Sequence, residues 1–80
     1  MQVRVKLFAT LARAVSGARA GEAFVRSLPA GSTVGDLAAS LGLPLSQVRL
    51  VFVDGLAKGL DEPLGDGAEV GLFPPIGGGG

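Results

Sequence analysis

The beginning of the chain alternates between apolar residues and polar or charged ones. Residues 2–9, QVRVKLFA, repeat with a period of two, which is typical of a strand with one buried face. The two faces carry Val3, Val5 and Leu7 on one side, and Arg4, Lys6 and Phe8 on the other. We therefore predict a first strand whose valine and leucine side chains point into the core.

Two segments have the spacing of helices. Residues 10–17, TLARAVSG, end in a glycine that can stop a helix, and they predict a short one. Residues 32–42, STVGDLAASLG, give the stronger signal, because Thr33 and Asp36 can form a reciprocal capping box. The apolar stripe of this main helix consists of Val34, Leu37, Ala38 and Leu41, with Gly42 as its expected end. We expect this helix to cover the sheet.

Three further segments read as strands. Residues 22–31 supply a second strand that forms a hairpin-like pair with the first, and residues 49–55 and 64–73 supply two more, each bordered by an Asp-Gly turn signal. Residues 56–63 supply at most a short edge strand. The first and last long strands are expected to be parallel neighbours, because a long connection separates them. The prediction is an α+β fold with a mixed sheet of four to five strands and one main helix across one face.

Two of the four phenylalanines are expected on the sheet face that the helix does not cover. In EVGLF, Val70 and Leu72 share the core face, which leaves Phe73 on the opposite face, and Phe8 lies opposite the apolar set of the first strand. Clustered surface aromatics are typical of protein interfaces. Two interpretations stay open. The two rings form a docking patch, or they are not both exposed, because a bulge shifts the alternation of one strand or because one ring folds over the edge of the sheet.

Composition narrows the classes of function. Hydrophobic residues make up 48% of the chain, so it can form a core, and a net charge of zero without a basic block argues against nucleic-acid binding. The chain has no Cys and no His. The absence of Cys excludes disulfides and zinc–thiolate or iron–sulfur sites, and we expect no metal site. The absence of His removes the usual general base, which argues against catalysis by side chains of this chain. No apolar run is long enough to span a membrane, and we expect a cytoplasmic protein without a membrane partner.

The chain closes with FPPIGGGG, which divides it into an expected domain at residues 1–73 and an extended, flexible tail at residues 74–80. Pro74 and Pro75 hold their segment extended, and glycines let a backbone pass through a channel too narrow for side chains. From Phe73 to Gly80 an extended chain reaches at most about 25 Å. The tail is either an arm that delivers the terminal carboxylate or an inert end.

The C-terminal segment DEPLGDGAEVGLFPPIGGGG resembles the signature of the ubiquitin-like sulfur-carrier family (MoaD/ThiS), most closely that of molybdopterin synthase small subunits. The family pattern L-x-D-G-D-x-V, F-P-P and Gly-Gly is matched at Leu64, Asp66, Gly67, Val70, Phe73, Pro74, Pro75, Gly79 and Gly80. Weaker similarity covers VKLFA, STVGDL and VFVDG, where the family often has Asn in place of Asp54. Ala68 replaces a usual acidic residue, and four glycines replace the usual two. The resemblance implies a β-grasp (ubiquitin-like) fold.

The resemblance also implies a function, which is sulfur transfer in molybdopterin (molybdenum cofactor) biosynthesis. An activating adenylyltransferase would use ATP to adenylate Gly80, and a sulfur donor protein would then displace AMP to leave a thiocarboxylate. The molybdopterin synthase large subunit would receive the tail and supply the catalytic side chains, so this chain is a co-substrate with no bound cofactor. Phe8 and Phe73 are then the docking candidates, Pro74 and Pro75 direct the tail, and Gly77, Gly78 and Gly79 let it pass.

Three alternatives remain at this point. The same chemistry serves thiamine synthesis, tRNA thiolation or a tungsten cofactor in other members of the family. A ubiquitin-like protein modifier would join Gly80 to a lysine by an isopeptide bond. A β-grasp binding module with an inert tail would need neither reaction.

Overall fold

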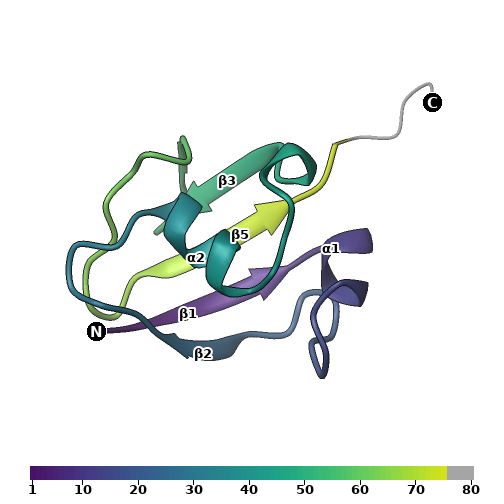
Figure 1. Cartoon of the computed structure of the whole chain (residues 1–80), viewed down its shortest axis with the longest axis horizontal. Helices are drawn as coiled ribbons and strands as arrows, with labels where there is room; N and C mark the ends of the chain where they lie inside the picture. Colours follow the sequence, from purple (N-terminus) through teal and green to yellow (C-terminus); the bar gives the residue numbers. More distant parts are fainter. Residues whose placement is uncertain (76–80) are drawn as a thin grey trace.

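Five strands form one mixed sheet in the order β2-β1-β5-β3-β4, and the main helix lies across one face of it (Figure 1). The computed structural model describes residues 1–75. The elements are β1 (Gln2–Leu7), α1 (Thr10–Arg13), β2 (Phe24–Ser27), α2 (Val34–Ser40), the 3₁₀ turn η1 (Leu45–Gln47), β3 (Leu50–Val53), β4 (Leu56–Lys58) and β5 (Glu69–Phe73). This arrangement confirms the predicted α+β, β-grasp fold.

The pairing of the strands agrees with the sequence prediction. β1 pairs with β2 in antiparallel orientation and with β5 in parallel orientation, so the first and last strands are neighbours. β5 also pairs antiparallel with β3, and β4 pairs only with β3 at one edge of the sheet. β5 therefore lies in the centre of the sheet, and the chain leaves the domain from its end.

Helix α2 begins with the predicted capping box. The Thr33 N–H donates to Asp36 Oδ2 at 2.9 Å, and the Asp36 N–H donates to Thr33 Oγ1 at 3.2 Å. These two bonds satisfy backbone donors that the first helical turn would leave unpaired. Gly42 follows the helix with φ +76°, the left-handed conformation that ends helices.

The core lies between α2 and the covered face of the sheet. Its central side chains are almost completely inaccessible to solvent: Val3, Val5, Leu7, Val34, Leu37, Ala38, Val70 and Leu72. The burial of β1 alternates strictly along the strand, as its polar–apolar pattern predicts. Val51 and Val53 of β3 complete the same face. The predicted orientation of both long strands is confirmed.

Several elements are shorter than the sequence indicated. Helix α1 ends at Arg13 and not near Gly17, because the Ala14 N–H bonds to the Leu11 carbonyl, three residues back, and closes the helix there. β1 and β2 each end before their apolar pattern does, and β5 begins only at Glu69. Residues 64–68 instead form a loop that the Asp66 carboxylate ties to β1 by accepting the Gln2 N–H at 2.8 Å.

The β3–β4 connection is a two-residue turn at Asp54 and Gly55. Both residues have positive φ, 51° and 83°, which is the geometry of a type I′ hairpin turn. The Asp54 carboxylate accepts the Glu69 N–H at 3.0 Å and links this turn to the start of β5. The Asp-Gly signal in the sequence therefore predicted the turn correctly.

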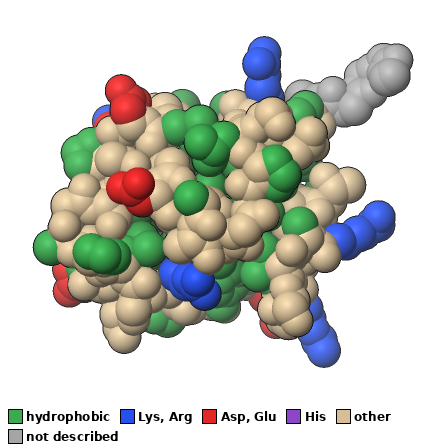
Figure 2. All heavy atoms as spheres, viewed as in Figure 1, with side chains coloured by type: hydrophobic (Ala, Val, Ile, Leu, Met, Phe, Trp, Pro, Cys, Tyr) green, Lys and Arg blue, Asp and Glu red, His purple; other side chains and the backbone are tan. Residues whose placement is uncertain are grey.

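Charged side chains are distributed unevenly along the molecule. Figure 2 shows several Lys and Arg side chains projecting from the end where β1 and β5 finish, with others elsewhere on this face, while most Asp and Glu lie towards the opposite end. Five of the seven acidic residues fall between residues 54 and 69, in the turns and loop that precede β5 and at its first residue. Within residues 1–75, no helix is long and apolar enough to cross a membrane.

Candidate functional site

The face of the sheet opposite α2 carries the candidate site, and the register of β1 and β5 assembles it. Leu7 is paired with Leu72, and the Phe8 N–H extends the ladder by donating to the Leu72 carbonyl at 3.2 Å. Because side chains alternate between faces, Phe8 and Phe73 both point away from α2. Two residues far apart in the sequence thus meet where the domain ends and the tail begins.

The rings of Phe8 and Phe73 stack on one another. Their centroids are 4.1 Å apart and their planes differ by 2°. The predicted position of both residues on the uncovered face is confirmed, but neither is fully exposed, because each ring covers part of the other. Stacked aromatic pairs contribute about 0.5–1.5 kcal/mol beyond the area that they bury. The pair is therefore a fixed feature of the surface and not two loose side chains.

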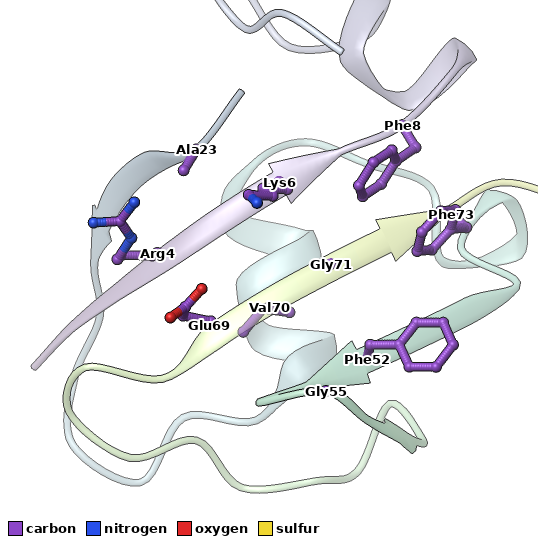
Figure 3. A pocket seen from close by; sticks show the side chains of 10 residues that line it. All are labelled: Arg4, Lys6, Phe8, Ala23, Phe52, Gly55, Glu69, Val70, Gly71 and Phe73. Carbon is purple, nitrogen blue, oxygen red and sulfur yellow. The ribbon is translucent and has the colours of Figure 1, made fainter. Parts of the chain in front are cut away.

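Phe52 of β3 completes an aromatic cluster that we define as Phe8, Phe52 and Phe73. Its ring meets Phe73 edge to face, with centroids 5.8 Å apart and planes at 82° (Figure 3). The sequence pattern alone did not predict Phe52 as part of this surface. Its alternation with the two core valines Val51 and Val53 would have placed it on the uncovered face once the direction of β3 was known.

Gly71 provides the floor beneath the cluster. A Cβ atom at this position would lie 3.6 Å from Phe8 Cε2 and 3.7 Å from Phe73 Cε1, which is ordinary van der Waals contact. A methyl group would fit there, whereas a longer side chain would have to find room beside the two rings. The glycine therefore allows the aromatic rings to lie close to the sheet between β1 and β3 (Figure 3).

The uncovered face becomes charged towards the start of β1 and β5. Arg4 and Glu69 are direct register partners, and Lys6 follows on the same face of β1. Together with the aromatic cluster they line a shallow hollow of about 200 Å³ (Figure 3). The face is thus apolar at the end where the tail leaves and mixed in charge at the other end.

A larger hollow, of about 540 Å³, lies at the base of the tail. Among the described residues, its lining is almost entirely apolar and includes one charged side chain, that of Arg49; the others are Phe8, Ala9, Leu50, Phe73, Pro74 and Pro75. The Arg49 N–H donates to the Phe73 carbonyl at 2.9 Å and holds the end of β5 in place. The first proline follows this strand directly, so the sheet sets the direction in which the chain departs.

The remaining predicted site residues belong to the tail. Pro74 and Pro75 are described and line the hollow at its base. Gly77, Gly78, Gly79 and Gly80 lie outside the described residues. Among residues 1–75, no group of Asp, Glu, His or Cys side chains has the arrangement of a metal site.

Comparison with known proteins agrees with this geometry. The ThiS family profile matches residues 5–79, so the chain belongs to the ThiS family of ubiquitin-like sulfur carriers. The family that the C-terminal motif indicated is thereby confirmed. A comparison with curated proteins gave no match.

Solved structures provide further relatives. SAMP1 from Haloferax volcanii is 31% identical with a TM-score of 0.70, and the alignment covers 99% of this chain and 100% of that one. A proposed molybdopterin converting factor subunit 1 from Pyrococcus furiosus is 29% identical with a TM-score of 0.68, covering 95% and 99%. A complex of subunits 1 and 2 of the molybdopterin-converting factor from Helicobacter pylori is 24% identical with a TM-score of 0.58, covering 99% and 100%, and shares the fold.

Proposed function

We propose that this chain carries sulfur as a thiocarboxylate on Gly80 and donates it in molybdopterin biosynthesis, as the small subunit of molybdopterin synthase. One observation carries the proposal. The central strand β5 passes without a polar spacer into Pro74 and Pro75, beside an aromatic cluster that the core does not require. This arrangement favours a domain that docks by the cluster and presents the following chain to a partner.

The chemistry needs an activation step, because a carboxylate is a poor electrophile. An activating adenylyltransferase would join the Gly80 carboxylate to the AMP portion of ATP and release pyrophosphate. A sulfur donor protein would then supply sulfur at the oxidation level of sulfide, which displaces AMP and leaves the thiocarboxylate. The chain contributes no catalytic side chain to either step, which fits its lack of Cys and His.

Two kinds of support favour molybdopterin over the other acceptors. The Phe73-Pro74-Pro75 motif is similar to that of molybdopterin synthase small subunits, and the Pyrococcus furiosus relative is described as subunit 1 of a molybdopterin converting factor. The partner that receives the tail is then the large subunit of the synthase. The Helicobacter pylori pair shows that a chain of this fold assembles with a second subunit of that factor.

A second function has its own support. SAMP1 is described as a small archaeal modifier protein, and its similarity extends over the whole chain. An adenylated Gly80 could react with a lysine amine in place of sulfur, which would join the chain to another protein by an isopeptide bond. The first reaction step is common to both functions, so only the acceptor distinguishes them.

Deletion of the gene in the source organism separates these functions. Molybdopterin, thiamine, thiolated tRNA bases and lysine-linked conjugates are measured in the deletion strain and after complementation with the full chain or with a chain that lacks Gly79 and Gly80. Loss of molybdopterin alone, restored only by the full chain, supports the first proposal. Loss of conjugates with normal molybdopterin supports a modifier, and complete rescue by the truncated chain contradicts both.

A further inference from the structure

Two arginines lie close to the place where the tail leaves the domain. Arg49 lines the hollow at the base of the tail, and Arg13 lines a neighbouring hollow that shares Ala9 with it. Both arginines are exposed. We call Arg13 and Arg49 the tail-exit arginines. They lie at the end of the molecule where β1 and β5 finish.

Carboxylates do not neutralise these two arginines within residues 1–75. The ion pairs of this part of the chain are Arg19–Glu22 at 4.0 Å and Lys58–Glu62 at 3.9 Å, and neither includes a tail-exit arginine. Glu22, the acidic residue of this end, is already paired with Arg19. Most other carboxylates lie at the opposite end, where Asp54 and Asp66 are tied to backbone N–H groups of β5 and β1. Although the chain has zero net charge, the two tail-exit arginines therefore stand apart from most of its carboxylates, whereas Arg4 and Lys58 lie beside Glu69 and Glu62.

We infer that the protein partners which receive the tail carry Asp and Glu carboxylates around an apolar channel mouth, and that the tail-exit arginines guide this chain onto that mouth. The inference rests on the proposed function, since it names the chemistry of the partner surface. Separated charges of opposite sign on two proteins raise the rate at which they meet in the correct orientation. The orientation of the encounter matters here, because the tail must enter the partner's channel with its C-terminus first.

The surroundings of the arginines favour a protein over a nucleic acid. The hollow that Arg49 lines is otherwise formed by aromatic, leucine, alanine and proline side chains, which would bury against an apolar surface. Nucleic-acid binding relies on neutralising many phosphates, for which two arginines beside a mostly apolar hollow are few. The observations therefore fit a mouth with an apolar contact area and an acidic rim.

The test measures association of this chain with the adenylyltransferase of the source organism that adenylates it, by stopped-flow fluorescence at two salt concentrations. The variants are Arg49→Glu, the double variant Arg13→Glu with Arg49→Glu, and the control Lys58→Glu. The control makes the same change in net charge as Arg49→Glu but on the edge strand β4 beside Glu62. Urea unfolding confirms that each variant is folded, and a single-stranded RNA oligonucleotide serves as a second ligand.

At about 0.05 M salt we expect the association rate constant to fall about five- to tenfold for Arg49→Glu and further for the double variant, with less than about a twofold change for Lys58→Glu. At about 0.5 M salt the differences should shrink below about twofold, because screening shortens the range of the charges. Replacing a carboxylate at the partner's channel mouth with Lys should restore the rate of the double variant.

Three results would overturn the inference. The first is an equal association rate constant for wild type and the double variant, and the second is an equal loss of that rate constant for Arg49→Glu and Lys58→Glu. The third is binding of the RNA by the wild type that the double variant abolishes. ATP–pyrophosphate exchange at saturating concentrations of wild-type chain is measured in parallel. Absence of exchange with every adenylyltransferase of the organism contradicts the proposed function itself, whereas normal exchange with unchanged association rates contradicts only the role of the tail-exit arginines.

Discussion

Leu72 and Phe73 are adjacent in β5 but face opposite sides of the sheet, so their replacement should have opposite consequences. Leu72 is completely buried between the sheet and α2, in register with Leu7 and Val51. Phe73 is half-buried and contacts the rings of the aromatic cluster. We predict that Leu72→Ala damages mainly the fold, and that Phe73→Ala damages mainly the docking of partners.

The expected magnitudes differ enough to be measured. Removal of a buried leucine side chain costs about 2–5 kcal/mol, because burial is lost and a cavity remains. A chain of 80 residues has a free energy of unfolding of roughly 4–12 kcal/mol, so Leu72→Ala would remove a large part of it. Phe73→Ala loses a stack and an edge contact that are partly open to water, which costs about 1–2 kcal/mol. In the complex, a buried aromatic anchor is worth about 2 kcal/mol or more, roughly thirtyfold in affinity.

Urea unfolding of both variants gives the change in the free energy of unfolding, and calorimetric titration with the activating enzyme gives the affinity of the folded protein. We expect Leu72→Ala to retain near-normal affinity under conditions where it is folded, and Phe73→Ala to remain folded but bind at least about tenfold more weakly. An equal loss of stability in both variants, or unchanged affinity for Phe73→Ala, would show that our assignment of the two faces to core and docking surface is wrong.

Three further predictions concern the same surface. Phe52→Ala removes one edge contact of Phe73, so it should weaken partner binding about threefold to tenfold and lower the free energy of unfolding by about 1 kcal/mol. Normal binding by this variant would restrict the docking surface to the other two rings. Gly71→Leu should disperse the aromatic cluster, seen as altered ring resonances in NMR spectra, whereas Gly71→Ala should preserve them, because a Cβ fits there at ordinary contact distance. Ala9 has φ 51° and ψ −128°, which is unfavourable for a residue with a Cβ, so Ala9→Gly should raise the free energy of unfolding by about 1 kcal/mol in urea titrations; destabilisation would contradict the strain.

The parts of the fold that the sequence predicted best are those with a clear period or cap. The strict alternation of β1 and the Thr33–Asp36 capping box each allow one interpretation, and both were correct. The end of α1 could not be predicted, because hydrogen bonds of the first turn and not side-chain spacing decide where so short a helix stops. A period or a cap therefore predicts an element well, whereas a helix of one turn carries too little of either to show where it ends.

The site was predictable in part for the same reason. Phe73 could be assigned to the uncovered face because Val70 and Leu72 define the core side of β5, and Phe8 followed from β1. Phe52 lies in a run that is apolar throughout, so its pattern gives no face until the register with β5 is known. The position of the two tail-exit arginines was hidden as well, since Arg13 and Arg49 reach the same end of the molecule only through the pairing of distant strands.

The central claim is that Gly80 is the sulfur-bearing residue, and mass spectrometry of the intact protein tests it most directly. The chain is incubated with its activating enzyme, ATP and a sulfur donor, beside a variant that lacks Gly80 and one extended by a lysine. Loss of one residue moves the carboxylate by about 3.5 Å, more than reacting groups tolerate. We predict that the wild-type mass increases by the replacement of one oxygen with sulfur, while the extended chain does not change and the shortened chain reacts poorly. Equal thiolation of all three chains, or none of the wild type, would contradict the account.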